Sequence, residues 1–245
     1  MAYVIYRIQK LAAGSRGAGT LGQCLQHLRK HTVSAEISKP QKSKDNLLKG
    51  CTDYKAAMHF INECKKKHNE THKRGFRSDA AVACEMVFSY SPEEPTGQKN
   101  RKGEDIMQPF GQSLEYALEY EKRMLAFIRE QFPKMRIATI ARHMDEGSIH
   151  WHIVGVCFDD KTSTLSVRQM VGGPADLKKQ QSRLAELCAD IGLKRGIPKE
   201  ITKSKHQTKR EHNRLELAAH AQRIERAEQE AEQALADIGL SDFDR

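Results

Sequence analysis

The chain has 245 residues, of which 38% are hydrophobic and 30% are charged. A chain of this length buries a substantial core, and its charged residues require a large ionic surface. No apolar run approaches the roughly 20 residues that span a bilayer, and the first residues are not those of a signal peptide. We therefore expect a cytoplasmic protein with no membrane segment.

The six cysteines are scattered along the chain, and no two of them form a Cys-x-x-Cys pair. This spacing argues against a disulfide framework and against a zinc ribbon. Free thiols usually behave as small hydrophobic side chains. We expect these cysteines to be buried and unpaired.

Positive charge is concentrated in the first third of the chain. Lys and Arg number 41 against 32 Asp and Glu, which gives a net charge of +9. Residues 1–80 hold 16 Lys and Arg against 6 Asp and Glu, a balance of +10, and the remaining 165 residues sum to −1. A basic region on a nearly neutral body predicts a localised contact with a polyanion, most simply nucleic acid.

The first half of the chain contains two predicted strands and a helix. Residues 2–9 and 80–91 are rich in β-branched, aromatic and other apolar side chains, which is typical of strands. Residues 54–68 place apolar side chains at helical spacing. Two prolines and a polar composition predict a long loop from Pro92 to about Asp105.

The second half begins with an amphipathic helix over residues 111–132. Its predicted buried face consists of Leu114, Ala117, Leu118, Met124, Leu125 and Ile128. Strands 136–144 and 149–158 then form a hairpin, and a helix over about 174–191 ends at Gly192, a residue suited to a left-handed cap. This order predicts an α+β sandwich, with helices packed on one antiparallel or mixed sheet.

The C-terminal segment differs from the rest in composition. Leu217, Ile224, Ala231 and Ile238 repeat every seven residues in a highly charged stretch, but the intervening heptad positions include a glutamate. This pattern predicts a charged helix that is exposed or depends on a partner. We therefore divide the chain into a domain over residues 1–210 and a helical tail over residues 211–245.

Three of the eleven histidines fall within ten residues, at the predicted hairpin. His150 and His152 are two residues apart on a strand, so their rings project from the same face. With a turn over residues 145–148, His143 lies opposite His150, where facing Cβ atoms are about 4.5–5.5 Å apart. The three rings are therefore expected on one face of the sheet, with Trp151 on the other.

Three imidazoles this close would repel one another if they were protonated. A shared divalent ion keeps them neutral, and three protein ligands leave positions open for water or a substrate oxygen. His143, His150 and His152 are thus the predicted metal ligands. Glu146 stands at the turn, where a carboxylate orients a ligand or accepts a proton. Glu85, a charged residue within a predicted strand, either faces this site or serves a structural role.

The pattern His143-Met144-Asp145-Glu146 followed by His150-Trp151-His152 resembles the histidine hairpin of the MobV-type relaxases. These form the Mob/Pre plasmid mobilisation family, within the HUH-like nucleases. Supporting similarity extends over most of residues 1–210. It includes Tyr3–Leu11, His27-Leu28-Arg29, Asp45-Asn46, Ala81–Pro92, Gly172-Gly173, Gly192–Ile197 and Ser204-Lys205-His206.

The resemblance implies a relaxase, which nicks one DNA strand at the transfer origin of a plasmid or mobile element and carries it on a covalent histidine–5′-phosphate bond. It places the nucleophile at His27. The family usually shows His-Asn-x-Arg where this chain has His27-Leu28-Arg29, so His31 is a competitor. Glu146 is our candidate for accepting a proton from the other ring nitrogen of the nucleophile.

The resemblance also implies a divalent metal, Mn²⁺ or Mg²⁺, with Zn²⁺ as an alternative. The expected partner is origin DNA, with a double-stranded flank and an extruded single strand. Arg7, Arg29, Arg74 and Arg77 are the predicted phosphate contacts. A coupling protein, or a second copy bound through the C-terminal helix, is a further candidate partner.

Three other functions fit parts of the pattern. A mobilisation accessory protein would bind origin DNA without cutting it. A rolling-circle replication initiator would use a tyrosine, for which Tyr3, Tyr6 and Tyr90 are available, but the helix after the hairpin contains none. A zinc peptidase of the His-Glu-x-x-His type places its histidines on a helix and is disfavoured.

Overall fold

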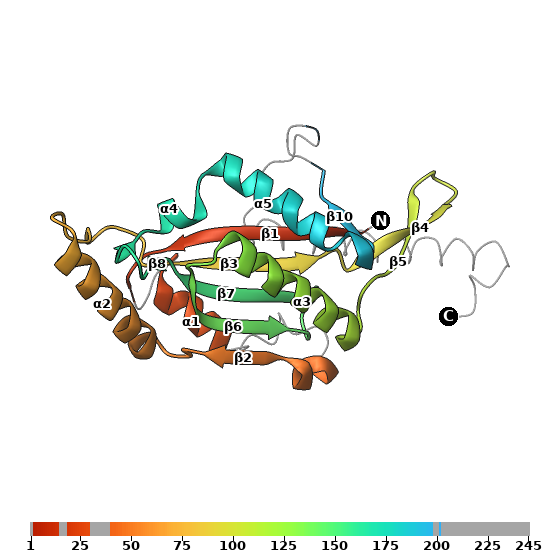
Figure 1. The fold of residues 1–245 in the computed structure, drawn as a ribbon. Coiled ribbons are helices and arrows are strands. Elements are labelled where there is room, and N and C mark those ends of the chain that lie inside the picture. The colour runs from red at the N-terminus through yellow and green to blue at the C-terminus, as the bar shows by residue number, and fades with distance from the viewer. Residues whose placement is uncertain (1, 15–18, 30–39, 198–200, 202–245) are drawn as a thin grey trace, which may run out of the picture. The chain divides into compact units, whose positions relative to one another are not determined.

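A six-stranded mixed sheet forms the centre of the protein (Figure 1). The computed structural model describes residues 2–14, 19–29, 40–197 and 201. The strand order is β10-β1-β3-β7-β6-β2, and every neighbouring pair is antiparallel except β1 and β10. The strands are β1 (Ala2–Leu11), β2 (Leu47–Gly50), β3 (Ala83–Tyr90), β6 (Arg136–His143), β7 (His150–Val156) and β10 (Leu193–Arg195). The mixed α+β architecture confirms the predicted fold class.

Helices cover the two faces of this sheet and create two hydrophobic cores. They are α1 (Leu21–Arg29), α2 (Tyr54–Thr71), α3 (Leu114–Gln131), α4 (Val167–Val171) and α5 (Pro174–Leu187). Side chains alternate between the faces of a strand, so Trp151 packs with α3 and α5 in one core while Val154 packs with α1 and α2 in the other. Figure 1 shows α3 crossing one face with α1 behind the strands.

The predicted buried face of α3 needs one correction. Ser113 caps this helix by accepting a hydrogen bond from the backbone N–H of Tyr116, at 3.1 Å. Leu118 is 41% exposed, whereas Tyr120 and Phe127 are fully buried. The prediction for Leu118 is wrong because the buried stripe is centred on Tyr120 and Met124, and Leu118 lies about 200° around the helix from Tyr120.

The segment predicted as a long loop is instead a two-stranded ribbon. It consists of β4 (Glu93–Lys99) and β5 (Asp105–Pro109), which pair antiparallel to each other. Side chains on both strands are exposed or only half-buried. The sequence therefore lacks the alternation of apolar and polar residues that marks a strand with one buried face.

Several short elements were not predicted from the sequence. They are the 3₁₀ helices η1 (Pro40–Asp45) and η2 (Ala189–Ile191) and the strands β8 (Phe158–Asp159) and β9 (Thr164–Leu165), together with β2, β10 and α4. Gly192 ends η2 with φ 83° and ψ 10°, which confirms the expected left-handed cap. The six cysteines are free, and only Cys51 is not fully buried, as expected.

Residues up to Gly196 form one compact unit, and the remainder belongs to a second. The predicted tail over residues 211–245 lies outside the described residues, as do His31 and His206. None of the helices in the described ranges combines the length and the apolar composition needed to cross a membrane.

Candidate metal centre

The three predicted metal ligands meet where β6 ends and β7 begins. His143 is paired with His150 across the two strands, and His152 follows on the same face. The ring centroids of His143 and His150 are 5.0 Å apart and nearly parallel. The ring of His152 lies 5.2 Å from that of His143 and 5.0 Å from that of His150, and stands roughly perpendicular to both. The hairpin thus gathers all three rings as expected.

Hydrogen bonds to Nδ1 fix the rings of His150 and His152 and leave the Nε2 atom of each ring available to bind a metal ion. The backbone carbonyl of Ser148 accepts a hydrogen bond from Nδ1 of His150 at 2.9 Å, and the Glu85 carboxylate lies 2.7 Å from Nδ1 of His152. Metal-binding histidines commonly donate their second ring N–H in this way. Nε2 of His152 is buried and has no hydrogen-bond partner within the described residues. A metal ion is a fitting partner for such a nitrogen.

The surroundings of His150 keep its ring neutral. Burial, followed by the nearby charge of His152, lowers the pKa of His150 to about 4. Metal binding requires the neutral form of imidazole. At neutral pH this ring therefore releases no proton when it binds a metal.

Glu146 lies between the first two histidines. One carboxylate oxygen is 3.6 Å from Nδ1 of His143, and the other is 3.7 Å from Nε2 of His150. The potential ligand atoms of these three residues lie within 4.8 Å of one another. Because bonds to a transition metal are about 2.1 Å long, small side-chain movements would place one ion between them. The structure thus makes Glu146 a candidate ligand in addition to the role expected from the sequence.

His27 of α1 joins the cluster from the helix that covers this face. Its ring centroid is 5.2 Å from that of His152 and 6.1 Å from that of His143. Cys24 is one helical turn earlier, and its thiol donates a hydrogen bond to the Glu85 carboxylate. Residues three apart share a helix face, so α1 presents Cys24 and His27 together to the sheet.

Glu85 therefore touches several members of the site. Burial acts to raise the pKa of its carboxyl, but His152, the Cys24 thiol and the nearby His27 together hold that pKa below its ordinary value. Burial and the adjacent Glu85 charge conversely raise the pKa of the Cys24 thiol. Of the two roles left open for Glu85 by the sequence, the structure supports the one at the site.

The turn that carries Glu146 is anchored by the segment before β2. Asp145 is fully buried and accepts hydrogen bonds from the Ser43 hydroxyl at 2.6 Å and from the Asn46 amide at 2.8 Å. The amide oxygen of Asn46 also accepts a bond from the backbone N–H of Met144, at 2.7 Å. The similarity at Asp45-Asn46 pointed to this segment, but nothing in the sequence pointed to Ser43.

A buried ion pair supports the same hairpin from the opposite face. Arg142 donates to the Glu121 carboxylate of α3 at 2.7 Å, and the indole of Trp151 donates to the same oxygen at 2.9 Å. The Arg142 guanidinium also donates to the carbonyl of Asp45. One arginine therefore links α3, the hairpin and the anchoring segment, a role that the sequence did not reveal.

The four arginines predicted to contact phosphates do not lie together in the structure. Arg7 is exposed on β1, and it shares the sheet face of His152 because Val87 pairs with both residues. Arg74 and Arg77 follow α2, whose last turn contacts β9, at the end of the sheet away from the histidines. Arg77 is also paired with Asp79. The side chain of Arg29 lies outside the described residues.

Two of the candidate tyrosines point away from the histidines. Tyr6 and Tyr90 are buried in the core on the opposite face, where their hydroxyls donate to Gln180 and to the carbonyl of Gly111. Burial raises the pKa of both hydroxyls. Neither side chain reaches the histidine cluster. Tyr3 is half-buried on β1.

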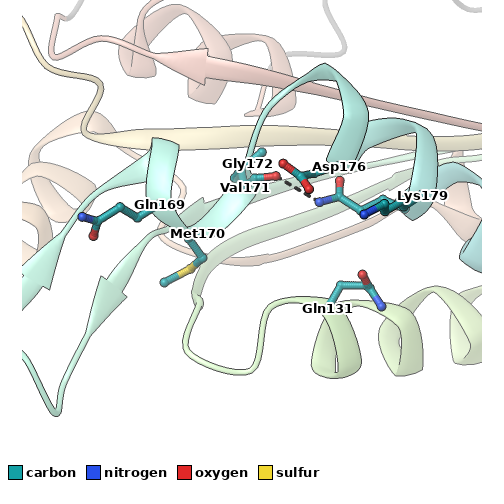
Figure 2. Close-up of a pocket in the computed structure, with 8 residues that line it drawn as sticks. Gln131, Gln169, Met170, Val171, Gly172, Asp176 and Lys179 are labelled. Atoms are coloured by element: carbon teal, nitrogen blue, oxygen red, sulfur yellow. Dashed lines mark hydrogen bonds between the residues drawn. The ribbon is translucent and has the colours of Figure 1, made fainter.

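A polar hollow lies elsewhere, on the helical side of the sheet. It encloses about 300 Å³ between the end of α3, α4 and the start of α5, and Gln180 donates to the carbonyl of Val171 within it (Figure 2). Its lining is Gln131, Gln169, Met170, Val171, Gly172, Asp176, Lys179 and Gln180. It shares no residue with the histidine cluster and holds no comparable group of ligands.

Comparison with known families identifies the chain. The model of the Mob_Pre family, described as a plasmid recombination enzyme, matches residues 1–214. The chain belongs to the Mob_Pre family. A search of curated proteins found no match.

Solved structures of Mob_Pre relaxase domains share the fold. Two Mn-bound structures of the MobM relaxase domain with plasmid pMV158 oriT DNA are 24% and 23% identical to this chain. They align with 86% and 87% of it and with 99% of their own chains, at TM-scores of 0.60 and 0.62. A third, bound to 26-nucleotide oriT DNA, is 21% identical over 86% of this chain and 99% of its own, with a TM-score of 0.54.

Proposed function

We propose that this Mob_Pre chain is a relaxase that nicks one strand of origin DNA with metal assistance and transfers it through His27. The observation that carries this proposal is the position of His27. Its ring lies against His152 and His143, next to the candidate metal ligands. A nucleophile and an electrophilic centre must be neighbours for phosphoryl transfer. We assign this activity to a domain over residues 1–210.

The proposed step exchanges one bond at phosphorus for another. A neutral ring nitrogen of His27 attacks the scissile phosphate, the bond from phosphorus to the 3′-oxygen breaks, and that oxygen leaves and takes up a proton. The product is a 5′-phosphate bound to His27 and a free 3′-hydroxyl. Attack of a 3′-hydroxyl reverses the step, so rejoining needs no nucleotide cofactor.

The residues around the scissile phosphate have separate tasks in this proposal. His143, His150 and His152, with Glu146, hold a divalent ion, Mn²⁺ or Mg²⁺ with Zn²⁺ as an alternative. When bound, the ion supplies positive charge against the phosphate oxygens. Glu85 orients His152 and lies close enough to influence His27. When Glu146 is not a metal ligand, it remains our candidate for accepting the N–H of the His27 ring nitrogen that does not attack phosphorus.

The DNA partner is proposed to approach the site past the exposed Arg7 of β1. Arg7 lies on the face of the histidines, which supports it as a phosphate contact. Arg29 belongs to the same helix as His27. Arg74 and Arg77 would contact DNA farther from the scissile phosphate. A coupling protein or a second copy, bound through residues 211–245, remains a further candidate partner.

A plasmid-nicking assay tests the proposal. Supercoiled plasmid that carries the cognate origin is incubated with the protein and Mn²⁺, and the products are separated before and after protease treatment. We expect open circles with covalently attached protein, and no cleavage in the presence of EDTA. Binding of the origin without any cleavage would contradict the proposal and would favour the accessory function.

A further inference from the structure

The side chain of Glu121 joins both strands of the histidine hairpin from the face opposite the histidines. Arg142 of β6 and Trp151 of β7 are register partners, and both donate to the same Glu121 oxygen, at 2.7 Å and 2.9 Å. Neighbouring residues of a strand point to opposite faces, so these two side chains lie behind the imidazoles. The side chains of Glu121, Arg142 and Trp151 are called the hairpin clamp below.

The hairpin clamp lies between the two residue pairs that present the candidate metal ligands. The next pair toward the turn is His143 with His150, and the preceding pair is Ala141 with His152. The backbone connects both of these pairs directly to the clamped pair. The separation of the strands at the clamp therefore controls the spacing of all three imidazoles on the other face.

Each member of the hairpin clamp has little freedom to move. The side chains of Arg142 and Glu121 are 10% and 17% exposed, and Trp151 is fully buried. The Trp151 ring also packs against that of Tyr120, with centroids 5.0 Å apart. The Arg142 guanidinium donates further to the carbonyl of Asp45, at 3.0 Å and 3.3 Å. Because a buried polar group without a partner is costly, these bonds hold the three side chains in one arrangement.

Stability alone does not account for a buried ion pair at this position. Removing two charges from water costs about as much free energy as their attraction returns, and apolar side chains of similar size are often equally stable there. An ion pair adds direction, since its hydrogen bonds form only over a narrow range of separations and angles. A metal site needs this precision, because its ligands must stay within about 0.5 Å of their productive positions.

We propose that Glu121 is a positioning residue that fixes the geometry of the metal site through Arg142 and Trp151. This inference rests on the proposed function. In this role Glu121 contacts neither the metal ion nor the DNA. It acts from the other side of the sheet, by holding β6 and β7 at the separation that brings the three histidines to one ion.

The test compares variants that remove the hairpin clamp with a variant that only lowers stability. In E121M/R142M, two unbranched apolar side chains replace the ion pair, so the fold is expected to lose little stability. Trp151→Phe removes the indole donor and keeps an aromatic ring in the core. The control Phe127→Leu shrinks a fully buried side chain of the same helix that packs against Tyr6, away from the histidines. Urea unfolding gives the stability of each variant.

Three further measurements need no DNA. Isothermal titration calorimetry gives the affinity for Mn²⁺, and the absorption spectrum of bound Co²⁺ reports the arrangement of the ligands around it. Hydrogen–deuterium exchange of the metal-free chain reports the pairing of residues 140–152.

E121M/R142M is expected to bind Mn²⁺ about 10- to 100-fold more weakly than the unmodified chain, with a changed Co²⁺ spectrum and faster exchange in the hairpin. Trp151→Phe should lose less affinity, since Arg142 still joins Glu121 to β6. Phe127→Leu is expected to lose stability but to keep the Mn²⁺ affinity and the Co²⁺ spectrum of the unmodified chain.

Unchanged Mn²⁺ affinity and unchanged exchange in E121M/R142M would overturn the proposal, and so would an equal loss of affinity in Phe127→Leu. If E121M/R142M does not fold, Trp151→Phe is judged by the same criteria. An unmodified chain that binds Mn²⁺ but does not nick origin DNA contradicts the proposed function and leaves this comparison intact. An unmodified chain that binds neither metal ion contradicts both proposals.

Discussion

Glu85 and His152 face each other from neighbouring strands, with a carboxylate oxygen 2.7 Å from Nδ1 of the ring. Val87 is the register partner of His152, so Glu85 reaches it diagonally along the same face of the sheet. The contact fixes the ring orientation that directs Nε2 into the cluster. This contact orients the candidate ligand His152 in a structure that contains no metal.

Replacing Glu85 with Gln is expected to weaken Mn²⁺ binding by about 10- to 100-fold. The amide cannot stabilise the ligating form of His152 as a carboxylate does. Isothermal titration calorimetry measures the affinity directly, without DNA. Glu115→Gln changes an exposed carboxylate on α3 and should leave the affinity unchanged. Equal affinity in Glu85→Gln and the unmodified chain would refute this role.

Replacing His27 with Ala is expected to abolish the covalent protein–DNA adduct while origin binding is retained. The adduct is detected as a shift in denaturing gel electrophoresis. His31→Ala and His59→Ala should still form it, since His59 is exposed on α2. Loss in His31→Ala alone would move the nucleophile to that residue. Adducts in both His27→Ala and His31→Ala would instead direct attention to a tyrosine.

Replacing Asn46 with Ala is expected to lower the free energy of unfolding by about 1–3 kcal/mol, because buried groups lose their partners. The affected groups are the Asp145 carboxylate and the backbone N–H of Met144. Mn²⁺ affinity should fall as well, since these bonds hold the turn of Glu146. Urea unfolding and calorimetry give the two values. The exposed Gln23→Ala variant is the control, and an equally small change in both variants would contradict the anchoring role.

The variants Phe88→Ala and Leu118→Ala together test which side chains pack in the core between α3 and the sheet. Phe88 is fully buried and its ring is stacked 4.8 Å from that of Tyr6, so its truncation should cost about 3–5 kcal/mol. Leu118 is exposed, and its truncation should change stability by less than about 0.5 kcal/mol. Denaturant unfolding at pH 7 distinguishes them. Similar losses would show that α3 packs with a different face.

His68 is expected to make stability depend on pH. Burial, followed by the nearby His72, lowers the pKa of His68, whose Nδ1 accepts a hydrogen bond from the backbone N–H of Leu165. The unfolded chain therefore binds a proton at higher pH than the folded chain, and stability falls as the pH drops below about 6.5.

Unfolding by urea between pH 7.5 and 5.5 checks this prediction by difference. His68→Gln should lose less stability over that range than the unmodified chain, whereas His59→Gln should follow the unmodified chain. Parallel curves for His68→Gln and the unmodified chain would show that His68 does not contribute.

Strong local patterns were sufficient for much of the fold and for the histidine hairpin. The two-residue spacing of His150 and His152 fixes a common face wherever the segment is a strand. The short turn also determines that His143 faces His150. Local patterns failed for the ribbon at residues 93–109, because neither of its faces is buried and no apolar alternation marks it. Helical spacing also led to the wrong prediction that Leu118 is buried, because apolar side chains occur on several faces of α3.

The amino-acid sequence by itself determined the α+β class and the three histidines on one strand pair, because these depend on composition and on contacts between residues near in the chain. Its histidine motif was also sufficient for the resemblance to the family. Only the tertiary structure decided that Glu85 supports His152, that Ser43 and Asn46 anchor Asp145, and that Arg142 joins Glu121 to the hairpin. These partners are separated by 21 to 102 residues along the chain. Their contacts follow from strand order and helix placement, which no local spacing encodes.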